Sequence, residues 1–92
     1  MNWMVYMVLC TDESLYTGIT TDIERRFDQH VTGSGARYFR GHVPLRVVYL
    51  EKGHDRSSAS MREAEIKKLH PAEKRRLLVA PVNCLRMRDD HT

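Results

Sequence analysis

The sequence contains no long hydrophobic run and very little cysteine. Its longest apolar stretch covers residues 3–10, which is far too short to cross a bilayer. The stretch also lacks the basic flank and small-residue cleavage site of a secretion signal. The two cysteines, Cys10 and Cys84, form no CxxC motif and no pairing with the histidines, so neither a disulfide framework nor a zinc site is expected. These absences argue against a membrane or disulfide-stapled protein, and the cytoplasm is the expected location.

Internal repeats, low-complexity segments and interdomain linkers are also missing from the sequence. The 92 residues suffice for one domain with one modest core. A hydrophobic fraction of 41% with 29% charged residues is typical of a globular protein. We expect the domain to cover residues 1–80 and the polar residues 81–92 to form a disordered tail.

Acidic residues are absent from one long segment. The net charge is only +3, but residues 31–46 contain Arg37, Arg40 and Arg46 and no aspartate or glutamate. Such a local basic surface attracts phosphate groups. A second basic cluster occupies residues 74–76. It fits either a phosphate-binding surface or a solvated helix face, and the solvated face is favoured.

Three segments predict β-strands. Residues 3–10 are apolar on both faces of a strand, which is typical of a central strand covered on both sides. A short polar turn follows at residues 12–14, so residues 15–20 are predicted to pair back in the antiparallel direction. A third strand is predicted over residues 45–51.

Three helices complete the predicted fold. Thr21 and Glu24 have the spacing of a capping box, and Ile23, Phe27 and Val31 repeat every four residues as a buried stripe. A second helix is predicted from about residue 55 to residue 69, and a third begins at residue 71, where proline suits a first turn. The prediction is an α/β (α+β) domain with a three-stranded antiparallel sheet of order 2-1-3 and the arrangement β-β-α-β-α-α.

Two tyrosines ten residues apart head an ordered set of polar residues. Tyr6 closes the segment MVY, Tyr16 opens the segment YTG, and Arg26, His30 and Glu63 follow. This set resembles the GIY-YIG nuclease domain, with MVY in the place of GIY and YTG in the place of YIG. The resemblance runs from about residue 3 to residue 78. It is closest to a small bacterial branch of single-domain, mostly uncharacterised proteins.

The resemblance implies a metal-dependent endonuclease that hydrolyses phosphodiester bonds of nucleic acid. In this interpretation Tyr6 activates the attacking water, Tyr16 and His30 assist, and Arg26 binds the scissile phosphate. Glu63 would hold one Mg²⁺ or Mn²⁺ ion. The family arrangement also implies a nucleic-acid partner, with DNA favoured over RNA, and no membrane.

The residue types suit these roles chemically. An arginine fork binds two phosphate oxygens at once, and magnesium commonly takes one carboxylate plus waters and substrate oxygens. Nearby cations lower the pKa of a tyrosine from about 10. Gly18 would leave room beside the phosphate. Arg37 and Arg40 alternate with aromatic residues, which suits a nucleic-acid backbone with unstacked bases.

Each residue also has a structural interpretation that the sequence leaves open. Tyr6 fits a core tyrosine, and Glu63 fits a surface ion pair with Lys67. Many family members carry a lysine where this chain has Ile19, and several carry an asparagine on the last helix, whereas here Asn83 lies beyond it. Two other functions therefore stay open: a nucleic-acid-binding module without catalysis, and a protein-interaction domain that retains the fold. A monomer is expected, with a possible protein partner supplying substrate specificity.

Overall fold

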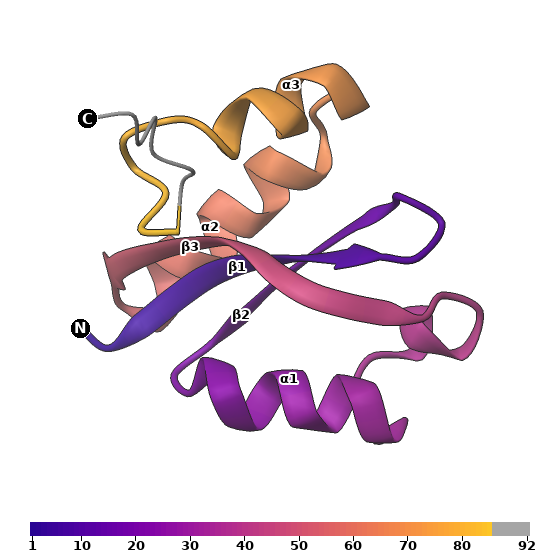
Figure 1. The fold of residues 1–92 in the computed structure, drawn as a ribbon. Helices are drawn as coiled ribbons and strands as arrows, with labels where there is room; N and C mark the ends of the chain where they lie inside the picture. The colour runs from indigo at the N-terminus through magenta and orange to yellow at the C-terminus, as the bar shows by residue number, and fades with distance from the viewer. Residues whose placement is uncertain (86–92) are drawn as a thin grey trace, which may run out of the picture.

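A computed structural model of the chain describes residues 1–85 and shows a three-stranded sheet between two helical layers (Figure 1). The elements in chain order are β1 (Trp3–Cys10), β2 (Leu15–Thr20), α1 (Ile23–Thr32), the 3₁₀ turn η1 (Arg37–Arg40), β3 (Pro44–His54), α2 (Arg56–Lys67) and α3 (Pro71–Leu77). The strands are antiparallel in the order β2-β1-β3. The predicted fold class, strand order and β-β-α-β-α-α arrangement are confirmed. No helix of residues 1–85 is long and apolar enough to span a bilayer.

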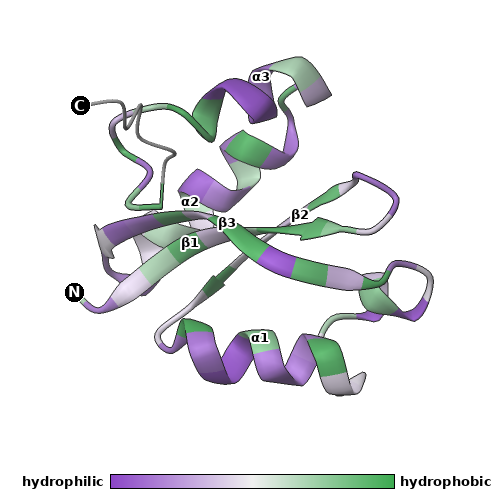
Figure 2. Ribbon diagram, in the orientation of Figure 1, coloured by the Kyte–Doolittle hydropathy of each residue, from purple (hydrophilic) through white to green (hydrophobic). Residues whose placement is uncertain are grey.

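The central strand β1 divides the core into two clusters, as its two apolar faces predict. Val5 and Met7 pack towards α2 with Tyr49 of β3, while Tyr6 and Val8 pack towards α1. All four β1 side chains are at most 1% exposed. In Figure 1, α1 lies on one side of the sheet and α2 and α3 lie on the other. Figure 2 shows the hydrophobic colouring concentrated on the strands and the connection between β1 and β2 coloured hydrophilic.

Helix α1 differs from the prediction in its cap and in its buried stripe. Asp22, and not Thr21, caps the helix, because its carboxylate accepts a hydrogen bond from Arg25 N–H. Val31 is 56% exposed, so its predicted place in the core is wrong. The buried residue of this last turn is His30, which is 1% exposed. The buried face of α1 includes His30 because Phe39 of η1, which follows later in the chain, packs against that side of the helix.

Helices α2 and α3 begin where the sequence predicts. Asp55 caps α2 by accepting from Ser58 N–H, and the Ser58 hydroxyl accepts in return from Asp55 N–H. Pro71 occupies the first turn of α3, and the preceding His70 N–H donates to Glu73. Strand β3 extends to residue 54, three residues beyond the predicted end.

The segment after α3 corrects the predicted domain boundary at residue 80. Asn83 is fully buried, although the sequence predicts a disordered tail at this position. Its side-chain oxygen accepts from Leu50 N–H at 2.9 Å, and its amide nitrogen donates to the carbonyls of Val48 and Leu78. The domain therefore includes Asn83, while the prediction for residues 86–92 lies outside the described residues.

Candidate active site

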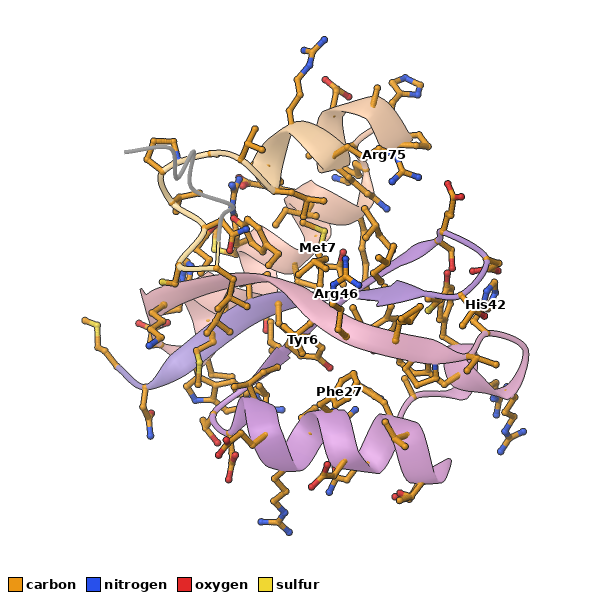
Figure 3. All side chains as sticks on the ribbon, viewed as in Figure 1. Tyr6, Met7, Phe27, His42, Arg46 and Arg75 are labelled. Carbon is orange, nitrogen blue, oxygen red and sulfur yellow. The ribbon has the colours of Figure 1, made fainter. Side chains whose placement is uncertain are left out.

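A buried hydrogen bond between Tyr6 and His30 forms the centre of the site. Tyr6 lies on β1 and His30 near the end of α1, and each residue is 1% exposed. Tyr6 Oη and His30 Nε2 are 2.7 Å apart. Figure 3 shows Tyr6 in the layer between the sheet and α1, with Phe27 opposite it on the helix. The sequence predicts both Tyr6 and His30 as site residues, and the fold brings them into direct contact.

The loop before η1 fixes the orientation of the His30 ring. A Cβ atom on Gly35 would lie 2.2 Å from His30 Nδ1, so only glycine allows this close approach. Ala36 N–H donates to Nδ1 at 3.4 Å, and this contact assigns the proton of the neutral ring to Nε2. Phe39 packs on the ring with centroids 4.3 Å apart. His30 therefore donates to the Tyr6 oxygen, and the hydroxyl proton of Tyr6 is left for another acceptor.

Both members of the pair are neutral in the free protein at neutral pH. Burial, with the nearby charge of Arg26, lowers the pKa of His30 to about 4. Burial and the neighbouring Tyr16 raise the pKa of Tyr6 above its ordinary value, and Arg26 only partly counteracts them. Tyr6 consequently needs additional positive charge before it can act as a base.

Tyr16 and Gly18 lie beside Tyr6 on the neighbouring strand. The strands β1 and β2 pair in the antiparallel direction, as predicted, and their register places Tyr16 opposite Val8 and Gly18 opposite Tyr6. The Tyr6 and Tyr16 ring centroids are 6.2 Å apart. A Cβ atom on Gly18 would lie 2.6 Å from Tyr6 Oη. Glycine at this position is therefore needed to seat the Tyr6 hydroxyl.

Arg26 lies next to the pair on α1 and is half-buried. Its Nη1 donates to Gln29 Oε1 at 2.9 Å, and no carboxylate within residues 1–85 forms an ion pair with its guanidinium. The side chain also borders a small polar groove of about 190 Å³ together with Thr20 and Gln29. Arg26 is thus close to Tyr6 and keeps most of its N–H donors available for an anion.

Glu63 of α2 is near the site, but it already has a cationic partner. Its carboxylate lies 3.0 Å from Lys67 Nζ, and its side chain is 23% exposed. The ion pair with Lys67 that the sequence leaves open is therefore present in the fold. Glu63 is one of the charges that act on Tyr6, and Lys67 Nζ is 6.0 Å from the centroid of the Tyr16 ring. Both α2 side chains thus belong to the surroundings of the two tyrosines.

A divalent ion at this site would have few protein ligands. Residues 1–85 contain no group of three or more histidine, cysteine, aspartate or glutamate side chains able to hold a metal. Glu63 can supply one anionic oxygen if Lys67 releases it. That set fits magnesium or manganese, which accept one carboxylate with waters and substrate phosphate oxygens, and does not fit zinc.

Arg37 and Arg40 lie apart from this cluster, at the two ends of η1, and both are exposed. The residues between them reach the site instead. Tyr38 and Phe39 both contact the Tyr16 ring, with centroids 5.3 and 4.9 Å apart. The loop therefore approaches the site through its aromatic residues, while its arginines face solvent. The alternation of aromatic residues and arginines is visible in the sequence, but the packing of Phe39 and Gly35 on His30 could not be predicted from it.

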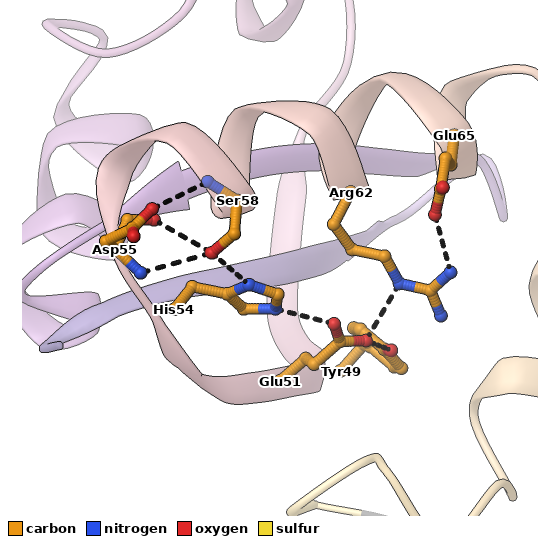
Figure 4. Close-up of polar contacts among 7 residues, drawn as sticks. All are labelled: Tyr49, Glu51, His54, Asp55, Ser58, Arg62 and Glu65. Atoms are coloured by element: carbon orange, nitrogen blue, oxygen red, sulfur yellow. Dashed lines mark hydrogen bonds and ion pairs between the residues drawn. The ribbon is translucent and has the colours of Figure 1, made fainter.

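A second polar cluster lies on the opposite face of the sheet, under α2 (Figure 4). Glu51 of β3 is 6% exposed and accepts hydrogen bonds from Tyr49, His54 and Arg62. Burial alone would raise the pKa of Glu51, but these three donors outweigh it and leave the pKa below its ordinary value. Arg62 also pairs with Glu65 at 3.1 Å. No pattern in the sequence indicates this cluster.

Comparison with known proteins gives matches along most of the chain. The model of the GIY-YIG catalytic domain matches residues 2–76. A UPF0213 protein of Natronomonas pharaonis is 49% identical over 74 residues, which cover 80% of this chain and 87% of that protein. The UPF0213 protein YhbQ of Escherichia coli is 43% identical over 76 residues, covering 83% and 76%. The solution structure of a UPF0213 protein from Bacillus halodurans is 41% identical, covers 85% of this chain and 83% of that chain, and has a TM-score of 0.54.

Proposed function

The chain belongs to the GIY-YIG catalytic-domain family, and from this premise we propose that it hydrolyses phosphodiester bonds of nucleic acid with one divalent metal ion. The observation that carries the proposal is the buried Tyr6–His30 hydrogen bond, whose tyrosine is within reach of the charges of both Arg26 and Glu63. The relatives are named only as UPF0213 proteins, so their names indicate no substrate.

The proposed reaction is attack of water on phosphorus: the water oxygen bonds to phosphorus, the bond from phosphorus to the 3′ oxygen breaks, and the leaving 3′ oxygen takes up a proton from solvent. Tyr6, as phenolate, accepts a proton from the attacking water, and His30 Nε2–H stabilises the phenolate oxygen by donating to it. Arg26 donates to the non-bridging phosphate oxygens and neutralises the charge that develops on them. Tyr16 borders the same space and orients the phosphate by hydrogen bonding.

The neutral state of Tyr6 in the free protein makes the reaction depend on substrate and metal. A divalent ion held by Glu63 would supply positive charge to the leaving oxygen and to the site as a whole. Lys67 must leave Glu63 for that carboxylate to become a ligand. Tyr6 thus loses its proton to solvent only in the loaded site, because burial disfavours phenolate without nearby cations.

The test is a cleavage assay on labelled DNA and RNA, single-stranded, duplex and branched, with magnesium, manganese or chelator. Glu63→Gln and Tyr6→Phe should each reduce metal-dependent cleavage by about 100-fold or more. Glu65→Gln is the matched control, since Glu65 lies two residues along α2 with a 65% exposed side chain. It should cleave like the wild type.

Thermal melting with and without metal completes the design. Metal should stabilise the wild type and the Tyr6→Phe variant but not Glu63→Gln, because only the last variant lacks the anionic ligand. If Glu63→Gln and Glu65→Gln cleave equally well, the metal role of Glu63 is wrong. If the wild type cleaves no member of the panel, the catalytic proposal fails.

The Glu63–Lys67 ion pair favours a second candidate function, a nucleic-acid-binding module without catalysis. Lys67 already neutralises the carboxylate that a metal would need. Binding without metal-dependent cleavage would identify this function. In either case, replacing Arg37 and Arg40 with alanine should flatten the dependence of log affinity on log salt, by roughly 0.9 for each duplex DNA phosphate that these arginines neutralise. Binding that ignores salt would exclude both functions.

A further inference from the structure

A groove outside the Tyr6 site is formed where the β1–β2 turn, η1 and α3 meet. Its volume is about 480 Å³, which is in the range of small-ligand sites, about 300–1,000 Å³. The residues that matter for its chemistry are Leu15, Tyr38, Lys74, Arg75, Asp12 and Glu13. Figure 3 shows Arg75 on α3 and His42 at the end of the molecule where the β1–β2 turn lies.

One wall of the groove is aromatic and continues into the candidate active site. Tyr38 lines the groove, and its ring is 5.3 Å from that of Tyr16, centroid to centroid. His42 stacks on Tyr38 with a centroid distance of 4.0 Å and an interplanar angle of 8°. Asp12 Oδ2 is 2.7 Å from His42 Nδ1, so the stacked pair is held to the β1–β2 turn. The groove and the proposed catalytic site thus share one fixed aromatic wall.

The facing wall is basic. Lys74 and Arg75 both come from α3 and line the groove. Arg75 Nη2 donates to the Glu13 carbonyl at 3.1 Å, which points the guanidinium across the groove. No carboxylate of residues 1–85 forms an ion pair with Lys74 or Arg75, so both cations are available to an anion.

The acidic residues of the groove limit where an anion can bind. Hydrogen bonds from the Ser14 hydroxyl and backbone, with further help from His42, lower the pKa of Asp12 to about 2. Asp12 is therefore ionised, but His42 and Ser14 occupy its oxygens. Glu13 adds an exposed carboxylate at the tip of the turn. A phosphate is consequently favoured on the α3 side and disfavoured beside the turn.

We propose that this groove binds an unpaired nucleotide of the nucleic-acid substrate, next to the scissile phosphate. The proposal rests on the function proposed above. The base would contact Tyr38 and Leu15, and the phosphate would contact Lys74 and Arg75. Aromatic side chains beside cations are the usual means of holding unstacked bases with their backbone. A base can lie against Tyr38 only when it is not stacked between its neighbours in a duplex, so the substrate has a single-stranded segment adjoining the cleavage position.

The fold gives Lys74 and Arg75, two members of the basic cluster at residues 74–76, this role. From sequence alone, a solvated face is the favoured interpretation of this basic cluster. The structure separates its members, because Lys74 and Arg75 line the groove with Tyr38 whereas Arg76 does not. Arg76 is exposed on the same helix. It is therefore a control with the same charge and nearly the same sequence position.

The experiment measures binding of a fluorescent DNA hairpin whose loop is replaced by a non-nucleotide linker, with a short single-stranded extension on its 5′ or its 3′ end, and of the same hairpin with a blunt end. For the extended hairpin, Lys74→Ala and Arg75→Ala should each flatten the salt dependence by about 0.7 for each single-strand phosphate that the side chain neutralises. Tyr38→Leu should weaken its binding by at least about 5-fold. Glu13→Gln should strengthen it. The blunt hairpin should bind these variants like the wild type, and Arg76→Ala should leave both probes unchanged.

Two results would contradict nucleotide binding in the groove without contradicting the catalytic proposal. One is a loss for Arg76→Ala equal to that for Lys74→Ala, which would indicate unspecific attraction. The other is an equal loss on blunt and extended hairpins, which would assign the residues to duplex binding. In both cases the wild type still cleaves with metal. A wild type that neither binds nor cleaves either hairpin would overturn both proposals together.

Discussion

The two faces of the sheet each bury a tyrosine near a histidine, yet they balance charge in opposite ways. Under α2, the carboxylate of Glu51 is surrounded by three donors, among them the guanidinium of Arg62. Under α1, Tyr6 and His30 form a neutral pair. Charged groups stand only at its border, and Arg26 there is bonded to a neutral amide.

This difference separates a structural network from a site. Buried charges that satisfy one another rigidify a fold, make the loss of either partner costly and leave nothing for a ligand. A neutral buried pair with an arginine at its edge keeps donors for an incoming anion. The face under α2 should therefore govern stability, and the face under α1 should govern activity. Four variants test that division, from the largest expected effect to the smallest.

Glu51→Gln should lower the free energy of unfolding by about 3 kcal/mol at neutral pH, because it leaves Arg62 without its buried partner. Cleavage should stay unchanged. Since the folded pKa of Glu51 is lowered, its contribution is present above the unfolded pKa of about 4.3 and is lost as pH falls through the folded pKa. Urea unfolding at neutral and acidic pH should show the gap between wild type and variant closing in acid. A constant gap would contradict the assignment.

His30→Gln should change how stability depends on pH. The folded ring has a pKa of about 4, against about 6.5 when unfolded, so the unfolded chain binds the extra proton between these values. The wild type should therefore lose roughly 3 kcal/mol as pH falls from about 6.5 to 4, and keep full stability above that window. The variant should lack this loss. Thermal melts across the window decide the matter, and parallel curves for the two proteins would show that His30 does not titrate there.

Gly18→Ala should cost about 1–2 kcal/mol and reduce cleavage, because the new methyl group pushes against the Tyr6 hydroxyl. Gly41→Ala is the matched control. Gly41 has a φ of −116° and no atom within 4 Å of an added Cβ, so its variant should melt and cleave like the wild type. Equal melting of the two variants would show that Tyr6 can move away without cost.

Glu65→Ala should have the smallest effect, within about 0.5 kcal/mol, because the pair with Arg62 is exposed to solvent on the glutamate side. Chemical denaturation of the variant beside Glu51→Gln measures the contrast directly. A loss as large as that of Glu51→Gln would mean that Arg62 depends on its outer partner for its position.

The fold could be predicted because its signals are local. The apolar run of β1, the polar turn before β2 and Pro71 at the start of α3 each specify a neighbouring element. The environment of His30 could not be predicted, since it depends on Gly35 and Phe39 from a later loop. The surroundings of Glu63 could be predicted only in part. Lys67 lies four residues later, so the ion pair is visible in the sequence, but the approach of Lys67 to the Tyr16 ring is not.

The side chain of Asn83 has a consequence for how copies of this protein meet. Strand β3 lies at one edge of the sheet, where free N–H and C=O groups can pair with a strand of another molecule and begin aggregation. Asn83 offers one acceptor and one donor to Leu50 and Val48, and the following Cys84 N–H bonds to the Leu50 carbonyl. Asn83 and Cys84 thus make the hydrogen bonds with β3 that a neighbouring strand would otherwise make. They protect the middle of this edge from intermolecular pairing without lengthening the sheet.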